Sequence, residues 1–120
     1  MRLRKVCVHS MPSSKQKAVC AAKKLFRETT DRIERAYTAT GLKPRRFVLL
    51  HDGAGCALGA VQLYEGLRYS QLVMPNIDGD YGIACGFNGT PLGATDPSYR
   101  LGFAIGRYVA KRVLAPAHAQ

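Results

Sequence analysis

LLHDGAGCALGA, residues 49–60, contains the central change of predicted secondary structure in this chain. An apolar run ends at His51-Asp52, a small turn spans Gly53-Ala54-Gly55, and a helix rich in small residues starts near Cys56. An apolar run of this length with flanking glycines favours a buried strand that is followed by a tight turn. The sequence therefore predicts a strand over Phe47–His51 and a helix from about Gly55 to Leu67.

A long helix is expected before this stretch. Ser13 is a typical N-cap residue, and Gln16 three positions later completes a capping box. Apolar side chains then recur at spacings of three and four from Val19 to Tyr37, which is the spacing of one helix face. The helix should end at Gly41, because glycine readily adopts the left-handed conformation that closes many helices.

Shorter helices are expected after the central stretch. Gly66 should end the helix that begins near residue 55, and Gly55 and Gly59 let a neighbouring backbone approach that helix closely. Either Asp78 or Asp80 should cap a short helix that continues to about residue 87.

The last helix has the clearest start signal. Asp96 suits the N-cap position and Pro97 the first helical position, so this helix should run from residue 97 to about 114 and stop before Pro116. Gly102 and Gly106, four positions apart, create a groove in which another helix can cross closely. Packing against a helix of the same chain is the simpler interpretation, and association of two copies is the alternative.

These expectations describe a mostly α fold in one domain, for which 120 residues suffice. We expect a compact helical domain of three to four helices, with room for a short strand or hairpin, and an α+β fold as the alternative. Residues 1–12 should form a flexible basic arm and residues 115–120 a frayed tail. The sequence contains no long apolar run and no recognisable secretory signal, so we expect a cytoplasmic protein without membrane contact.

Positive charge is concentrated in one half of the sequence. The formal net charge is +10, and 13 of the 18 lysines and arginines lie within residues 1–60 together with only four of the eight acids. Such a chain favours a polyanionic partner, nucleic acid above all, although a solvated basic surface without a partner has the same composition. The candidate contact residues for nucleic acid or an acidic protein surface are Arg2, Arg4, Lys5, Lys15, Lys17, Lys23, Lys24, Arg27, Lys43, Arg45 and Arg46.

The residue types also indicate the kind of contact. Lysine and arginine mainly bind phosphate, which gives affinity and salt dependence but does not read base sequence. The sequence contains no RRM, KH or helix-turn-helix pattern. Its aromatic residues do not alternate with the basic ones as a base-stacking surface would require.

Catalysis and metal binding have less support. The four cysteines are Cys7, Cys20, Cys56 and Cys85. They include no CxxC pair, so reduced and mostly buried thiols are expected. Cys56 at a helix start, with His51 close before it, would suit a cysteine nucleophile, and a small cysteine-dependent enzyme is therefore kept as an alternative. The sequence predicts no catalytic residue, no metal site and no cofactor.

The segment from Ile33 to Tyr64 resembles a group of small, uncharacterised bacterial and phage proteins. In that group a helix ends at a glycine, an apolar segment follows, and an Asp-Gly turn leads into a helix that starts Cys-Ala-Leu-Gly-Ala. The matching features here are Gly41, Phe47–Leu50, Asp52-Gly53 and Cys56–Ala60. The resemblance implies a small helical accessory protein from a phage or another mobile element, and it gives no residue a role.

Charge and resemblance lead to one main functional hypothesis. We expect a non-enzymatic accessory protein that binds nucleic acid or a nucleoprotein complex through its basic N-terminal half. The alternative is a protein–protein module, an inhibitor or assembly factor that recognises an acidic surface and can form homo-oligomers.

Overall fold

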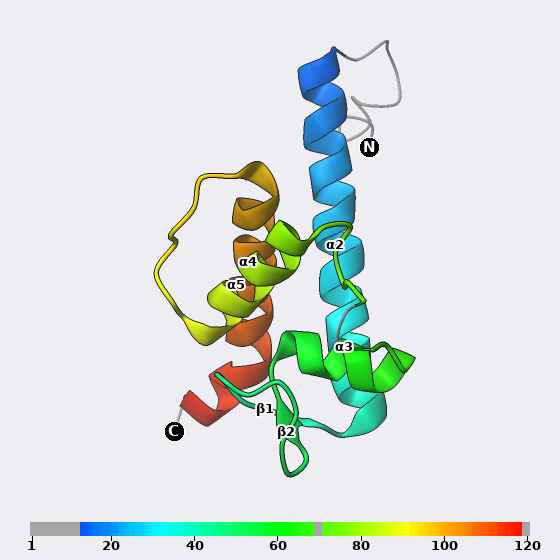
Figure 1. The fold of residues 1–120 in the computed structure, drawn as a ribbon, viewed down its shortest axis with the longest axis vertical. Helices are drawn as coiled ribbons and strands as arrows, with labels where there is room; N and C mark the ends of the chain where they lie inside the picture. The colour runs from blue at the N-terminus through cyan, green and yellow to red at the C-terminus, as the bar shows by residue number, and fades with distance from the viewer. Residues whose placement is uncertain (1–12, 69–70, 119–120) are drawn as a thin grey trace.

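Helices dominate the fold (Figure 1). The computed structural model describes residues 13–68 and 71–118, with side chains up to residue 114. Its elements in chain order are α2 (Ser14–Thr40), β1 (Lys43–Pro44), β2 (Ala54–Gly55), α3 (Ala57–Glu65), α4 (Ile77–Asn88) and α5 (Pro97–His118). Four helices and one very short strand pair within these residues confirm the predicted mostly α fold. None of these four helices combines the length and the apolar character that crossing a membrane requires.

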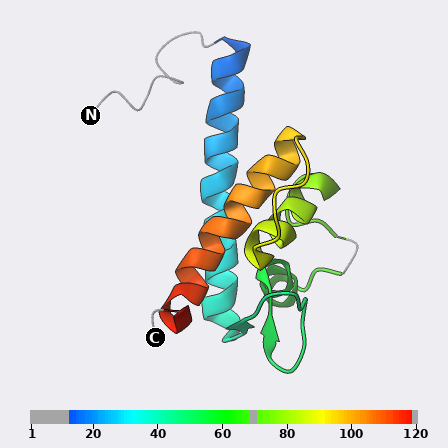
Figure 2. The ribbon, with the colours of Figure 1, turned by 90° about the vertical axis from the view of Figure 1, so that its left-hand side faces the viewer.

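α2 is the longest element and extends past the other described elements (Figures 1 and 2). At its start, the Ser13 hydroxyl oxygen accepts from the Gln16 N–H at 3.1 Å, and the Gln16 side chain accepts from the Ser13 N–H at 2.9 Å. At its end, Gly41 adopts the left-handed conformation with a φ of 70°. The predicted capping box and the predicted helix end are both confirmed.

The apolar stripe of α2 is buried over only part of its length. Buried positions begin at Thr29 and continue through Ile33 and Tyr37, whereas 46% of the surface of Val19 is exposed. The apolar stripe therefore extends further toward the N-terminus of α2 than the buried part of the helix does. The reason is visible in Figure 2, where the other described elements pack against the C-terminal part of α2.

α4 and α5 can pack closely because glycines lie on both sides of their contact. Gly82 and Gly86 of α4 face the backbone of α5, and Gly102 and Gly106 of α5 face the backbone of α4. The two helices run parallel, because residues 89–96 return the chain toward the start of α4 before α5 begins (Figure 1). α4 fills the Gly102/Gly106 groove, as the simpler interpretation predicted, so this groove is not open to a second copy.

The predicted strand over Phe47–His51 is wrong, because these residues form a loop. Phe47 has a φ of 64° and is 72% exposed, which does not suit a buried strand. The paired strands are β1 and β2 instead, and they run parallel. In the described ranges this run pairs with a strand only through an isolated bridge between His51 and Ala54, so its apolar side chains pack individually, with Leu49 against the core.

A tight turn and a glycine contact hold this loop on α3. Asp52 and the glycine after it both have positive φ, the pattern of a type I′ turn, which is closed by two hydrogen bonds between His51 and Ala54. The Leu49 carbonyl then occupies the space where a Cβ of Gly59 would lie. The predicted close approach of a backbone at Gly59 is confirmed.

Most predicted ends of the shorter helices are also confirmed. α3 ends at Gly66 in the left-handed conformation. α5 begins after Asp96, whose Oδ1 accepts from the N–H groups of residues 98 and 99 at 2.8 and 3.2 Å. However, α5 continues past Pro116 to His118, beyond the predicted end near residue 114. A proline so close to a helix end removes only one helical hydrogen bond, so the helix can continue past it.

The predicted cap of α4 is wrong. Asn76, rather than Asp78 or Asp80, is the N-cap, and its side-chain oxygen accepts from the Gly79 N–H at 2.7 Å. The Asp80 side chain cannot take this role because its carboxylate points inward and binds the N–H groups of residues 73 and 74.

A polar clamp supports the apolar core. The largest fully buried core side chains are Phe87, Ile33, Ile83, Ile105, Val61 and Val109. Beside this core, Arg32 donates through Nε and Nη2 to the two Glu65 carboxylate oxygens at 2.7 and 2.6 Å, and through Nη1 to the Val73 carbonyl at 2.7 Å. These bonds hold α3 and the following loop on α2, so Arg32 serves the fold.

Candidate functional site

The basic residues predicted to contact nucleic acid fall into two separate groups. Those on the N-terminal half of α2 are Lys15, Lys17, Lys23, Lys24 and Arg27. Those in the connector after α2 are Lys43, Arg45 and Arg46. At 1.5 Å per residue, roughly 25 Å of helix separates Lys24 from the end of α2, so the groups cannot form one compact site. Arg2, Arg4 and Lys5 lie outside the described residues.

The α2 group forms an open basic surface, called here the α2 basic surface. All five side chains are exposed, and the first turn of α2 contains no acid. At about 100° per residue, four of the five, all but Lys15, fall within an arc of about 120°. None of the five takes part in the ion pairs found within residues 13–68 and 71–114. Their charge is therefore available to a polyanion.

The connector group has a structural role in part. The Arg46 Nε donates to the Phe87 carbonyl at 3.0 Å, and the Phe47 N–H donates to the Asn88 Oδ1 at 2.8 Å. A guanidinium is favourable at the end of α4 because the last carbonyls of a helix carry partial negative charge. Arg46 therefore holds the loop on α4, whereas the other two cations of the connector are exposed.

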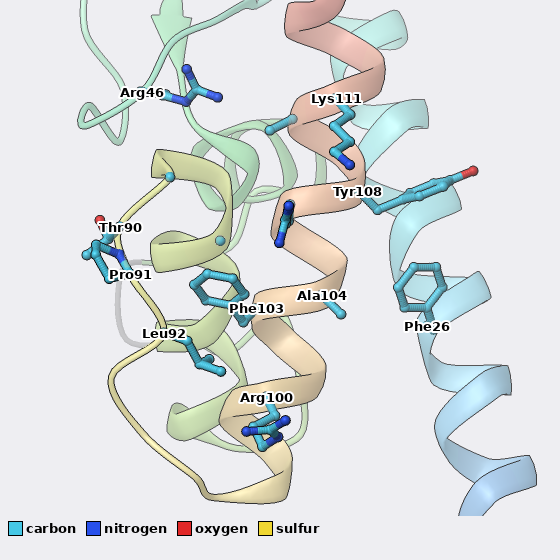
Figure 3. A pocket seen from close by; sticks show the side chains of 14 residues that line it. Phe26, Arg46, Thr90, Pro91, Leu92, Arg100, Phe103, Ala104, Tyr108 and Lys111 are labelled. Atoms are coloured by element: carbon cyan, nitrogen blue, oxygen red, sulfur yellow. The ribbon is translucent and has the colours of Figure 1, made fainter.

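The structure contains a third basic site that was not predicted, a groove along α5 (Figure 3). Its volume is about 900 Å³, and its walls come from α5, the loop before α5, Phe26 of α2 and the connector. The cations that line it are Arg46, Arg100, Arg107 and Lys111. No carboxylate from the described part of the chain lines this α5 groove, so its electrostatic potential is positive.

Aromatic and small side chains lie between these cations. Phe103 is partly exposed inside the α5 groove, and the exposed Ala104 beside it leaves open space at the helix surface (Figure 3). Across α5, Phe26 meets Tyr108 edge to face with 5.3 Å between ring centroids. The expectation that aromatic and basic residues do not alternate is wrong here, because the alternation lies on a helix face and across elements distant in sequence.

One sequence signal could have revealed part of this groove. Arg100, Phe103, Arg107 and Lys111 follow one another at spacings of three and four, which places them on one face of α5. The small net charge of residues 61–120 concealed this cationic face, because the acids of that half lie on other elements. Arg46 comes from a distant segment that no local pattern connects to α5.

The alternative of a cysteine-dependent enzyme gains no support from the solvent exposure of Cys56. Cys56 is the N-cap of α3 but only 6% exposed, and the exposed His51 places its Nε2 3.1 Å from the Asp52 Oδ2. A reactive Cys56–His51 pair stays a prediction. Cys56 and Cys85 are buried free thiols, but Cys20 is disulfide-bonded, so the expectation of four reduced thiols is wrong.

Comparison with known proteins assigns no function to any of these basic sites. The chain matches no protein-family model, no curated protein and no solved structure. In the part of the chain that the structure describes, no three His, Cys, Asp or Glu side chains come together as metal ligands. Function is therefore inferred from the α2 basic surface and the α5 groove.

Proposed function

We propose that this chain is a small basic accessory protein that binds nucleic acid, or a nucleoprotein complex, through the N-terminal half of α2. The supporting observation is the α2 basic surface, whose exposed cations lie on a helix that extends past the other described elements (Figures 1 and 2). Such cations neutralise phosphates and release counterions when they bind, which makes binding favourable and salt-dependent.

The shape of this surface favours nucleic acid over an acidic protein. A duplex carries one negative charge per about 1.7 Å along its axis, so a straight helix with cations over a wide arc meets phosphates wherever it lies against the backbone. Contacts of this kind give affinity without reading base sequence. An acidic protein surface is the second candidate, since the same exposed cations would meet it.

We infer a cytoplasmic setting from a sequence without a long apolar run, and an origin in a phage or another mobile element from the resemblance of Ile33–Tyr64. Disulfides persist mainly outside the reducing cytoplasm, so the disulfide at Cys20 is an observation against a cytoplasmic location. Cell fractionation combined with thiol trapping of Cys20 during lysis tests this inference. A Cys20 that stays oxidised in a non-cytoplasmic fraction would contradict it.

The binding test compares two variants with equal changes in charge. K23E/K24E alters the α2 basic surface, and K43E/R45E alters the two exposed cations of the connector while lowering the net charge by the same amount. Fluorescence anisotropy with labelled duplex DNA and RNA, at salt concentrations between about 50 and 300 mM, gives affinity and salt dependence together.

We expect K23E/K24E to bind about tenfold more weakly or worse, and its slope of log affinity against log salt to fall by about 2, since each phosphate contact contributes about 0.9. K43E/R45E should change both quantities much less. Equal losses in the two variants would indicate a general effect of net charge and overturn the assignment to α2. Binding to polyglutamate without binding to nucleic acid would favour the acidic-protein candidate.

A further inference from the structure

We propose that the α5 groove holds a short single-stranded segment of nucleic acid. Its phosphates would lie against Arg100, Arg107 and Lys111, and its bases against Phe103. This inference rests on the proposed nucleic-acid function and deepens it, because it adds a second contact surface and names the form of the ligand.

The charge of the groove fits a polyanion. Four cations line it and no carboxylate of the described residues does, whereas Arg112, the remaining arginine of α5, pairs with Glu34 outside the groove. Three of the four lining cations are arginines. The planar guanidinium can donate two parallel hydrogen bonds to one phosphate, so this composition suits a phosphate backbone.

The length of the groove fits a few nucleotides. Arg100 and Lys111 are eleven residues apart, which corresponds to about 16 Å along the α5 axis. A stacked strand rises about 3.4 Å per nucleotide, so this row of cations matches about five nucleotides. The groove volume is about 900 Å³. Sites for small molecules usually measure about 300 to 1,000 Å³, so the groove has room for a ligand at the large end of that range.

The aromatic side chains favour unpaired bases. Phe103 is partly exposed within the groove (Figure 3). Tyr108, which is 41% exposed, already contacts Phe26 and has the Arg112 guanidinium 5.5 Å from its ring centroid. In a duplex the bases stack on one another and cannot reach such rings, whereas the bases of a single strand can. An acidic peptide would satisfy the cations but would leave the Phe103 ring without a stacking partner.

Three variants separate the features on which the inference depends. R100Q/R107Q removes two cations without adding repulsion, F103L removes an aromatic ring but keeps an apolar side chain, and A104L fills the open space without changing the charge. Ala39→Leu is the matched control, because it makes the same change at an exposed position of α2 that does not line the groove. Thermal melting of each variant checks that the fold is retained.

The probes are a labelled oligothymidylate of about ten nucleotides, a duplex of the same length, and polyglutamate as competitor, all with the full chain. We expect the single strand to bind about tenfold more weakly to R100Q/R107Q and to A104L, and several-fold more weakly to F103L, with duplex binding changed less than about twofold. The salt slope for the single strand should fall by about 1.4 in R100Q/R107Q, at about 0.7 per lost phosphate contact.

Three results would overturn the groove assignment. They are equal single-strand affinities of A104L and the Ala39→Leu control, equal losses for single strand and duplex in all groove variants, and displacement by polyglutamate as effective as by unlabelled oligothymidylate. Loss of duplex binding in K23E/K24E without any effect of the groove variants would reject the groove and leave the α2 proposal intact. Failure of the unaltered protein to bind any nucleic acid would reject both.

Discussion

The buried carboxylate of Asp80 organises the chain between α3 and α4. Its oxygens accept from the N–H groups of Val73 at 2.9 Å and of Met74 at 2.6 Å. Burial raises the pKa of this carboxyl, while the hydrogen bonds from Met74 and Val73 and the charge of Arg32 act in the opposite direction. The carboxylate thus shapes the turn before α4, and this inward role leaves the capping position to Asn76.

Replacement of Asp80 by alanine should lower the free energy of unfolding by about 2 to 4 kcal/mol, because two buried N–H groups lose their acceptor. Asp78→Ala is the matched control, since Asp78 is exposed in the same helical turn. Its loss should be about 0.5 kcal/mol, the size of a helix-dipole effect. Urea unfolding followed by circular dichroism measures both. Equal losses would contradict the role assigned to Asp80.

At the scale of elements, glycine spacing decides how α4 and α5 pack. Gly82 and Gly86 on one helix and Gly102 and Gly106 on the other are each four residues apart, so each pair lies on one helix face. Glycine inside a helix costs about 0.5 to 1 kcal/mol relative to alanine. The close contact between the two backbones must offset that cost, so these four positions should tolerate no larger side chain.

Gly106→Ala tests this contact directly. Its Cβ would overlap the Ile83 carbonyl oxygen, and a backbone atom cannot move aside as a flexible side chain can. We expect a loss of about 3 kcal/mol or more, at the upper end of overpacking effects. Gly93→Ala is the control, because the nearest atom to its Cβ position is 3.9 Å away, and its effect should stay within about 0.5 kcal/mol. A Gly106→Ala protein that melts like the unaltered chain would rule out the contact.

At the scale of the whole molecule, acids serve the fold and surplus cations remain on the surface. Within the described residues, the acids that bind cations or backbone N–H groups are Glu34, Glu65, Asp80 and Asp96. These are four of the eight acids, whereas 18 lysines and arginines give the chain a formal net charge of +10. The surplus is therefore presented to solvent, on the α2 basic surface and in the α5 groove.

Acid should weaken the attachment of α3 to α2. The hydrogen bond from Arg32 lowers the pKa of Glu65 from its ordinary value, which is about 4.3. A carboxyl whose pKa is lowered by folding stabilises the fold above its unfolded-state pKa, and this contribution is lost as the pH falls through the folded-state pKa. We therefore expect the urea midpoint to decrease between about pH 5 and pH 3, and to decrease less in E65Q.

The comparison with E65Q isolates this effect. The pKa of Asp80 is raised by burial, so its folded form takes up a proton more readily and its contribution has the opposite sign as the pH falls. Asp80 is present in both proteins and cancels in the difference. Identical pH profiles for the two proteins would contradict the role assigned to Glu65.

Local contacts explain which sequence predictions were correct. The start of α2 after Ser13, its end at Gly41 and the start of α5 after Asp96 depend on hydrogen bonds between residues at most four apart. A prediction from neighbouring residues includes every atom involved. The prediction of a strand over Phe47–His51 was wrong because a strand needs a neighbouring strand, and residues 43–44 and 54–55 pair with each other instead.

The sequence by itself determined the caps at both ends of α2, at the end of α3 and at the start of α5, together with the mostly α fold and the surplus of positive charge, because these depend on composition and on close neighbours along the chain. Only the tertiary structure decided where the charge acts. It separated the cations of α2 from those of the connector, and it brought Phe26 and Arg46 beside α5 to complete a groove. Contacts between segments so distant in sequence form only when the whole chain packs, and no local pattern records which segments will meet.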